Sequence, residues 1–407
     1  MAAELQEVDE ASQMTAGASA GRADGAPLRM VIGVTTDQTC LVLRGRLRAL
    51  RLAGFEVTLV ASPGGTGLLR ETAAAEGVTA CPVPMRRGIA PLADLISMVR
   101  LCLLLRRLRP TITDFSTPKA GLLGNIAGWA LRVPHRVYTL RGLKLESSSG
   151  MQRQLLMASE RASAWCAHVV LCNSESLRKR TLELKIAPEQ KIRMLGDGSS
   201  NGVDTAKFSP GKSCVRGEMD LPDGAQVVGF VGRLTTDKGI PELLQAFDRI
   251  LQSKPCCWLL LVGWFDRAED ALEEHWRKRI ERHPRILCTG YVPDTADYYR
   301  AMDVMVLPTH REGFPNVALE ASASGIPVIA TASTGAVDAV IPEVTGLQIP
   351  VNDPVAIADA TLALLRDDEK RTRMGNAGRE WVLERFSRER VLGLAMEFYQ
   401  GMVNGNG

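Results

Sequence analysis

The chain has 407 residues, enough for two domains, and its 45% hydrophobic and 23% charged residues are ordinary for a soluble globular protein. No apolar run reaches the roughly 18 residues that a membrane-spanning helix needs, and the nine cysteines form no CxxC pair, which disfavours a disulfide framework or a zinc site. Residues 27–204 carry 25 basic and 13 acidic residues, a net charge of +12, whereas residues 205–407 carry a net charge of −5. The basic half favours an anionic partner such as phosphate, nucleic acid or an acidic membrane surface.

The first part of the chain alternates predicted strands with predicted helices. Residues 1–26 are small, acidic and polar and lack the apolar segment of a signal peptide, so we expect a disordered tail. From Leu28 onward the alternation predicts a parallel-sheet domain over residues 27–204. Its expected strands are 28–34, the start of 55–65 (before a glycine-rich turn), 78–83, 112–115, 135–140 and 168–172, and its expected helices are 41–53, 68–76, 90–108, 119–131, 152–166 and 175–184.

The same rhythm restarts after a turn-rich break and predicts a second domain over residues 205–385. A last helix near 388–403, within a segment 386–407, is expected to cross back to the first domain. The fold class is therefore α/β, with two doubly wound, Rossmann-like parallel-sheet domains that face a cleft, and ligands are expected at the carboxyl ends of the strands. The expected strands are 226–231, 258–262, 286–290, 303–307, 328–331 and 347–349, and the expected helices are 240–253, 267–282, 295–301, 315–324, 354–366 and 368–384.

A candidate phosphate-binding loop lies in VGRLTTDKGI, residues 231–240. A strand ends at Val231 and a helix begins near Ile240, so Arg233 and Lys238 flank a strand-to-helix loop beside a helix N-terminus. Two cations and free backbone N–H groups suit a diphosphate. The spacing does not match GxxxxGK[ST], and no GxGxxG follows a strand, which disfavours a P-loop NTPase and a dinucleotide oxidoreductase.

A second candidate loop lies within MVLPTHREGFPNVALEASASGIPVIAT, residues 305–331. Pro315 suits the first position of a helix that Gly325 would end. Glu312 precedes this helix and Glu320 lies about a turn and a half inside it. An ordinary crossover with two solvated glutamates remains an alternative interpretation. The free N–H groups at the helix start, which could bind oxyanions or sugar hydroxyls, are those of Gly313, Phe314 and Asn316.

Both loops follow strands of one predicted sheet, so they should face the same cleft. That arrangement suits a nucleoside diphosphate that carries a sugar. The cations would hold the diphosphate, one carboxylate would bind the ribose hydroxyls, and the other carboxylate would hold the sugar together with the helix amides.

The second half of the chain resembles the nucleotide-sugar domain of family 4 retaining glycosyltransferases of the GT-B fold. This resemblance implies that Arg233 and Lys238 bind the donor diphosphate, that Glu320 binds the ribose and that Glu312 acts at the transferred sugar. It also implies that the backbone near Val292 holds the base. The matching segments are residues 230–240, 290–294, 312–331 and 345–350.

The first half resembles the branch of that family that makes capsular polysaccharides and bacterial N-glycans. The segments that carry this resemblance are TLRGLKLESSSG (139–150), LCNSESLRKR (171–180) and GDGSSNGVD (196–204). Those enzymes act on undecaprenyl-diphosphate-linked sugars. Many relatives carry a histidine where this chain has Arg141, so the group that contacts the sugar from this side is Arg141 or a residue still to be identified.

The resemblance implies a cytoplasmic retaining enzyme at the inner face of the cell membrane. It would move a sugar, an N-acetylhexosamine in our expectation, from a UDP-sugar to a polyprenyl-diphosphate-linked acceptor, with no nucleic acid partner. The sequence contains no DxD motif, and we expect no metal and no cofactor. The alternatives are a nucleotide-sugar 2-epimerase and a catalytically inactive sugar-nucleotide-binding module.

The segment PLADLISMVRLCLLLRRLRP, residues 91–110, suggests how the protein reaches a bilayer. A cationic amphipathic helix can lie on an anionic membrane surface. The alternative for its leucines is burial against the sheet, as in any crossover helix, so we expect mainly electrostatic binding. The basic residues expected to take part are Arg86, Arg87, Arg106, Arg107 and Arg109.

Overall fold

The computed structural model describes residues 28–86, 88, 90–266 and 271–405, and the predicted tail 1–26 lies outside these residues. The first domain is built on a seven-stranded sheet of order β3-β2-β1-β4-β5-β6-β7, in which all paired strands are parallel. Its strands are β1 (Leu28–Thr36), β2 (Phe55–Ser62), β3 (Thr79–Pro82), β4 (Ile112–Ser116), β5 (His135–Leu140), β6 (Val169–Cys172) and β7 (Ile192–Arg193).

Helices cover both faces of this sheet, because its strands are apolar on both sides. One face, with Ile32 and Leu59, packs on α2 (Arg46–Leu52) and α3 (Leu68–Glu76), and the other, with Val31 and Phe115, packs on α4 (Pro91–Leu108) and α5 (Pro118–Ala130). The helices are η1 (Asp37–Leu43), α2 (Arg46–Leu52), α3 (Leu68–Glu76), α4 (Pro91–Leu108), α5 (Pro118–Ala130), η2 (Lys144–Ser147), α6 (Gly150–Cys166), α7 (Glu175–Glu183) and η3 (Glu189–Lys191).

The second domain has a six-stranded parallel sheet of order β10-β9-β8-β11-β12-β13. The prediction of two doubly wound parallel-sheet domains is therefore confirmed. The strands are β8 (Val227–Val231), β9 (Trp258–Val262), β10 (Ile286–Cys288), β11 (Val304–Leu307), β12 (Val328–Thr331) and β13 (Gly346–Ile349). The helices of this domain are α8 (Val215–Glu218), η4 (Thr236–Lys238), α9 (Ile240–Ser253), α10 (Glu274–Arg282), α11 (Ala296–Ala301), α12 (Asn316–Ala323), η5 (Val337–Ala339), α13 (Pro354–Arg366) and α14 (Asp368–Arg385), and α15 (Arg388–Asn404) follows them in the chain.

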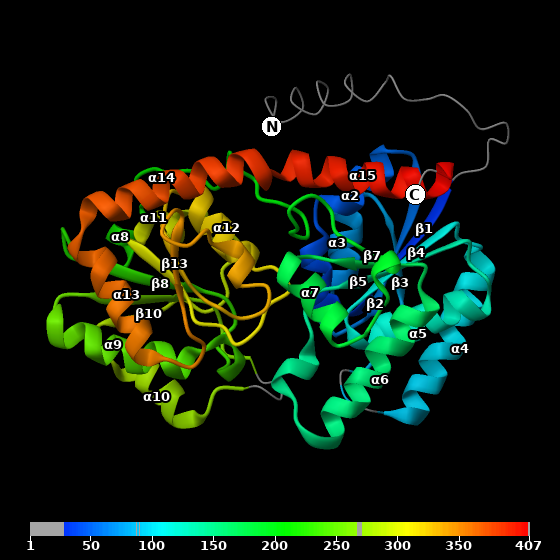
Figure 1. Cartoon of the computed structure of the whole chain (residues 1–407), viewed down its shortest axis with the longest axis horizontal. Coiled ribbons are helices and arrows are strands. Elements are labelled where there is room, and N and C mark those ends of the chain that lie inside the picture. The colour runs from blue at the N-terminus through cyan, green and yellow to red at the C-terminus, as the bar shows by residue number, and fades with distance from the viewer. Residues whose placement is uncertain (1–27, 87, 89, 267–270, 406–407) are drawn as a thin grey trace.

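The last two helices connect the two lobes, as Figure 1 shows: α14 lies over the second domain and α15 over the first. The chain passes between the domains beside Val203, whose N–H and carbonyl pair with the backbone of Phe386 and Arg388. Tyr399 of α15 is fully buried in the core of the first domain, and its hydroxyl donates to Asp114 Oδ2 at 2.6 Å.

Three expected helices differ at their boundaries. Instead of one helix over 41–53, the chain forms η1 and α2, because Gly45 has a positive φ of 82° that interrupts helical geometry. Helix α10 begins at Glu274 rather than at 267, and residues 267–270 lie outside the described residues. Pro315 is the N-cap residue of α12 rather than its first helical residue, since its ψ of 98° is extended.

Helix α4 does not bury most of its leucines. Leu101 and Leu105 pack against the sheet, but the opposite face carries apolar side chains that are more than half exposed. The alternative that the leucines of this helix are buried against the sheet is therefore wrong for the side chains on this face. The exposed side chains, at helical spacing, are Leu92, Leu95, Ile96, Val99 and Leu103.

The cysteines are free, as the absence of a CxxC pair predicts, but they are not uniformly buried. The apolar sequence around Cys288 predicts a small buried side chain, but that prediction is wrong: Cys288 is exposed because it ends the edge strand β10. Among the described residues, no helix combines the length and the apolar character that crossing a bilayer would require.

Candidate functional site

The two candidate loops meet at the carboxyl end of the second sheet. Strands β8 and β11 are neighbours, so the loops that follow them lie side by side. Gly239 makes this approach possible, because a Cβ there would lie 2.1 Å from the Pro308 carbonyl oxygen. Lys238 Nζ donates to Glu312 Oε1 at 2.5 Å, and each of the two side chains is less than one fifth exposed. This contact confirms that the two loops lie together at one edge of the sheet, and the binding roles of their residues stay predictions.

Arg233, at the end of β8, takes a carboxylate partner that sequence reasoning missed. Its Nη1 lies 2.7 Å from Asp266 Oδ2, and one third of the arginine side chain is exposed. Asp266 follows β9, the strand that pairs with β8 on its other side. The two predicted cations are therefore each held by a carboxylate, and both lie beside the glycine-containing turn that leads into α9.

Glu320 projects from α12 toward a second buried partner. The hydroxyl of Tyr299, which is fully buried in α11, donates to Glu320 Oε2 at 2.8 Å. Burial raises the pKa of Glu320, and the hydrogen bond from Tyr299 opposes that rise. One carboxylate oxygen is thus fixed, which sets the direction in which the other can accept. Val292, between β10 and α11, packs against the same apolar core as Tyr299.

The first domain closes on the start of α12 through two glycines. A Cβ on Gly313 would lie 2.5 Å from the Arg141 carbonyl carbon, and one on Gly142 would lie 3.3 Å from the Gly313 nitrogen. Side chains at these positions would hold the domains apart. The backbone at Gly313 and the buried Phe314, which contacts Phe386 at a ring distance of 5.3 Å, therefore lie at the domain interface.

Arg141 itself is anchored within the first domain. Its Nε donates to Ser116 Oγ at 3.1 Å and its Nη1 to Ser200 Oγ at 3.0 Å. Burial, and then the positive charge of Arg46, lower the pKa of Arg141 to about 10, so it stays cationic at neutral pH. We did not predict Arg46 as part of the site. It is one of several arginines in residues 44–51, and nothing in the sequence distinguishes it from the others.

Hydrogen bonds also join the domains around this interface. Ser199 Oγ and Asn316 Oδ1 lie 3.1 Å apart, so the side chain of Asn316 contacts the first domain. The Asp338 carboxylate accepts from the backbone N–H of Ser176 at 3.1 Å and from its hydroxyl. Glu146 accepts from the Thr334 hydroxyl at 2.9 Å. Sequence reasoning missed these contacts.

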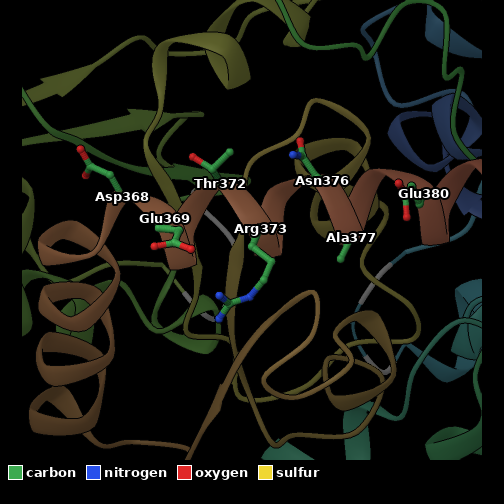
Figure 2. Close-up of a pocket in the computed structure, with 7 residues that line it drawn as sticks. All are labelled: Asp368, Glu369, Thr372, Arg373, Asn376, Ala377 and Glu380. Carbon is green, nitrogen blue, oxygen red and sulfur yellow. The ribbon is translucent and has the colours of Figure 1, made fainter.

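Two hollows differ in their relation to the strand ends. One has a volume of about 720 Å³, and its described lining residues all belong to α14 rather than to strand ends, as Figure 2 shows. The other, of about 190 Å³, lies at the domain interface beside Arg141 and Gly142. We place the candidate site at the interface because its side chains come from several strand ends, where parallel α/β sheets bind ligands.

Within the described part of the chain, no group of three His, Cys, Asp or Glu residues could hold a metal ion.

Comparisons with known proteins agree with this architecture. Residues 42–198 match the family described as a glycosyl transferase 4-like domain, and residues 215–381 match glycosyl transferases group 1. The chain is 36% identical over 355 residues to the capsular polysaccharide biosynthesis glycosyltransferase CapM of Staphylococcus aureus. The alignment covers 87% of this chain and 92% of that protein.

Solved structures with the same fold include a glycosyltransferase from Rickettsia africae. It is 17% identical in sequence with a TM-score of 0.73, and the superposition covers 93% of this chain and 99% of that one. Anabaena HepE in complex with UDP and glucose is 18% identical with a TM-score of 0.76, and covers 92% of this chain and all of that one. The expected GT-B arrangement of two Rossmann-like domains is confirmed by these likenesses.

Proposed function

Because this chain belongs to the glycosyltransferases of group 1 with a family 4-like first domain, we propose that it transfers a sugar from a UDP-sugar to a polyprenyl-diphosphate-linked acceptor, with retention of anomeric configuration, in capsule or related cell-surface polysaccharide synthesis. The observation that supports this most is the Lys238–Glu312 pair at the junction of two strand ends. There, a cation suited to a diphosphate and a carboxylate suited to a sugar are in direct contact. The transferred sugar in our proposal is an N-acetylhexosamine.

In this proposal the donor diphosphate binds beside Arg233 and Lys238, and each cation turns from its carboxylate partner toward the phosphates. The bond between sugar C1 and the phosphate oxygen breaks as the acceptor hydroxyl forms a bond to C1 on the same face. The acceptor proton passes to the departing phosphate oxygen. Lys238 and Arg233 stabilise the negative charge that develops on the leaving diphosphate, as preorganised donors do in transition states.

Other groups of the site bind and orient the donor. The free Glu320 carboxylate oxygen accepts from a ribose hydroxyl, and the backbone near Val292 contacts the base. Glu312 and the N–H groups of residues 313–316 hold the sugar hydroxyls, with Arg141 nearby on the first domain. None of these roles requires a metal or a cofactor. The expectation that the enzyme uses neither stays a prediction.

The proposal also includes docking on an anionic membrane at its cytoplasmic face. The exposed apolar stripe of α4 runs beside Arg100 and Arg106, which are exposed. An amphipathic helix of this kind lies in a bilayer interface, with leucines toward the acyl chains and arginines toward anionic headgroups. The exposed stripe adds an apolar contribution to the electrostatic binding that we expect from residues 106–109. Arg86 is available for the same contact, and Arg87 lies outside the described residues.

The experiment that tests the catalytic proposal is incubation of the purified protein with a panel of UDP-sugars, with and without a prenyl-diphosphate-linked sugar. We expect slow release of UDP from one UDP-N-acetylhexosamine and faster release with acceptor. A product that keeps the donor's anomeric configuration supports retention. No UDP release from any UDP-sugar contradicts the proposal, and a 2-epimerised UDP-sugar formed without acceptor indicates the epimerase alternative.

A further inference from the structure

The interface hollow of about 190 Å³ is a candidate binding site separate from the Arg233 and Lys238 loop. It lies at the carboxyl ends of β4 and β5, since Thr117 follows β4 and Arg141 follows β5. Among the described lining residues, Arg311 alone comes from the second domain, so the hollow takes its full shape only when the domains are together. Its lining residues are Thr117, Pro118, Tyr138, Arg141, Gly142, Lys144 and Arg311.

Three of the lining side chains are cationic: Arg141, Lys144 and Arg311. Arg311 is held in place by two hydrogen bonds, from its Nε to Ser147 Oγ at 2.8 Å and from its Nη2 to Asp237 Oδ2 at 3.2 Å. The hydrogen bond to Asp237 is also an ion pair, so Arg311 brings N–H donors to the hollow more than net charge. The three side chains together bring donors and a positive potential from two domains to one small hollow, where the surrounding protein screens charge less than water does.

A buried arginine behind the hollow adds to this potential. Arg46 is 1% exposed, and among the described residues neither its Nε nor its Nη1 has a hydrogen-bond partner. The Asp114 carboxylate acts on Arg141, and it already accepts from the hydroxyls of Thr139 at 2.7 Å and Tyr399 at 2.6 Å. Arg46 therefore keeps buried N–H groups without an acceptor among the described residues, and an anion in the hollow would offset the positive charge of Arg46 and Arg141.

The start of α5 contributes in the same direction. This helix has 13 residues and begins at Pro118, so the positive end of its dipole points toward the hollow that Thr117 and Pro118 line. The lining cations, the buried Arg46 and the start of α5 combine into a site for a compact anion with several oxygens, such as a phosphate or a diphosphate.

The surroundings indicate where such an anion comes from. Lys119, next to the hollow, lies 2.7 Å from Asp94 Oδ1 and also donates to the Gly88 carbonyl, which ties the start of α5 to the start of α4. Leu92 and Leu95 on that turn of α4 are 81% and 62% exposed. A ligand with its phosphates in the hollow could therefore lay an attached apolar chain along the exposed stripe of α4.

We propose that this hollow binds the diphosphate of the prenyl-linked acceptor, while the donor diphosphate binds beside Arg233 and Lys238. The inference rests on the proposed function, and it assigns Lys144, Arg141 and Arg311 to acceptor binding. Two diphosphate sites on opposite sides of Gly313 would bring the sugar of one substrate next to the sugar of the other.

The test uses isothermal titration calorimetry on the full chain saturated with UDP, which fills the donor diphosphate site. Inorganic pyrophosphate and geranyl diphosphate, a short soluble prenyl diphosphate, are the two probes. We expect both to bind, geranyl diphosphate more tightly, and Lys144→Gln to weaken both by about tenfold or more, the loss typical of one hydrogen bond to a charged group. Arg311→Gln serves as a second variant, and Lys278→Gln on the exposed face of α10 is the matched control.

The outcomes separate this inference from the proposed function. Loss of pyrophosphate binding on saturation with UDP, or equal affinities for the Lys144→Gln, Arg311→Gln and control proteins, would overturn the second site. Equal affinities for the two probes would overturn its assignment to a prenyl-linked ligand. Release of UDP from UDP-sugars by the same protein preparation tests the proposed function independently, since it needs no acceptor.

Discussion

At the scale of single residues, Lys238 is the side chain whose loss should cost most. We expect Lys238→Ala to lower turnover at least about a hundredfold, the usual effect of removing one transition-state donor. The substitution also leaves the partly buried Glu312 carboxylate without its cation. Turnover with a UDP-sugar, measured on protein with an unchanged melting temperature, tests this. Lys278→Ala is the control, and a Lys238→Ala protein as active as that control would rule out the assignment.

The two glutamates of the 312–320 segment should separate binding from turnover. We expect Glu320→Ala to weaken UDP binding by about tenfold, since it removes a charged acceptor. Glu312→Ala should leave UDP affinity unchanged or higher, because it frees Lys238, while it slows transfer. Calorimetry with UDP alone measures the difference, and Tyr299→Phe controls for the lost contact with the phenol. Equal losses of UDP affinity in both glutamate variants would contradict the two roles.

Glu160 predicts a pH dependence of stability. It is 2% exposed, accepts from the Tyr138 hydroxyl, and burial raises its pKa to about 7 from 4.5. Because the folded state holds this proton more tightly than the unfolded state, the wild-type protein loses stability as pH rises from about 4.5 through 7. Glu160→Gln removes this loss. The melting temperature of the variant relative to wild type should therefore be higher at pH 8 than at pH 5, and Glu183→Gln at an exposed site should show no such change.

At the scale of one element, α4 should carry both parts of membrane binding. Replacement of Arg106, Arg107 and Arg109 by glutamine should weaken sedimentation with anionic liposomes at low salt, by about 1 kcal/mol for each charge. Leu95→Glu combined with Val99→Ser should weaken the binding that remains at high salt, where charge is screened. Val355→Ser on α13, 44% exposed, is the apolar control. If the protein does not sediment with anionic vesicles at low salt, α4 is not a membrane-docking helix.

At the scale of the whole molecule, the contacts between the domains should control turnover. Asp338 accepts from Ser176 at the start of α7, and the nearby Thr334 carbonyl accepts from the Glu312 N–H at 2.8 Å. Asp338→Ala should therefore lower turnover by about tenfold through misplacement of Glu312, with little change in UDP affinity. Small-angle X-ray scattering should show a larger radius of gyration for this variant, and the exposed Asp359→Asn is the control. An unchanged radius together with unchanged turnover would show that this contact has no role in closure.

The sequence by itself determined the alternation of strands and helices, the two parallel sheets and the loops that carry Arg233, Lys238, Glu312 and Glu320. These features are local: apolar periodicity, glycine and proline positions, and charges next to strand ends are all visible within about ten residues. The family resemblance rests on the same local segments.

Only the tertiary structure decided which side chains meet. Asp266, Tyr299 and Arg46 have no local pattern that separates them from other polar residues, and Asp338 reaches Ser176 across 162 positions of the chain. The same holds for the leucines of α4, whose spacing fits burial and exposure equally well. Which face of that helix meets the sheet depends on how Leu101 and Leu105 pack against Val31 and Phe115, and such packing between distant segments leaves no signal in a short stretch of sequence.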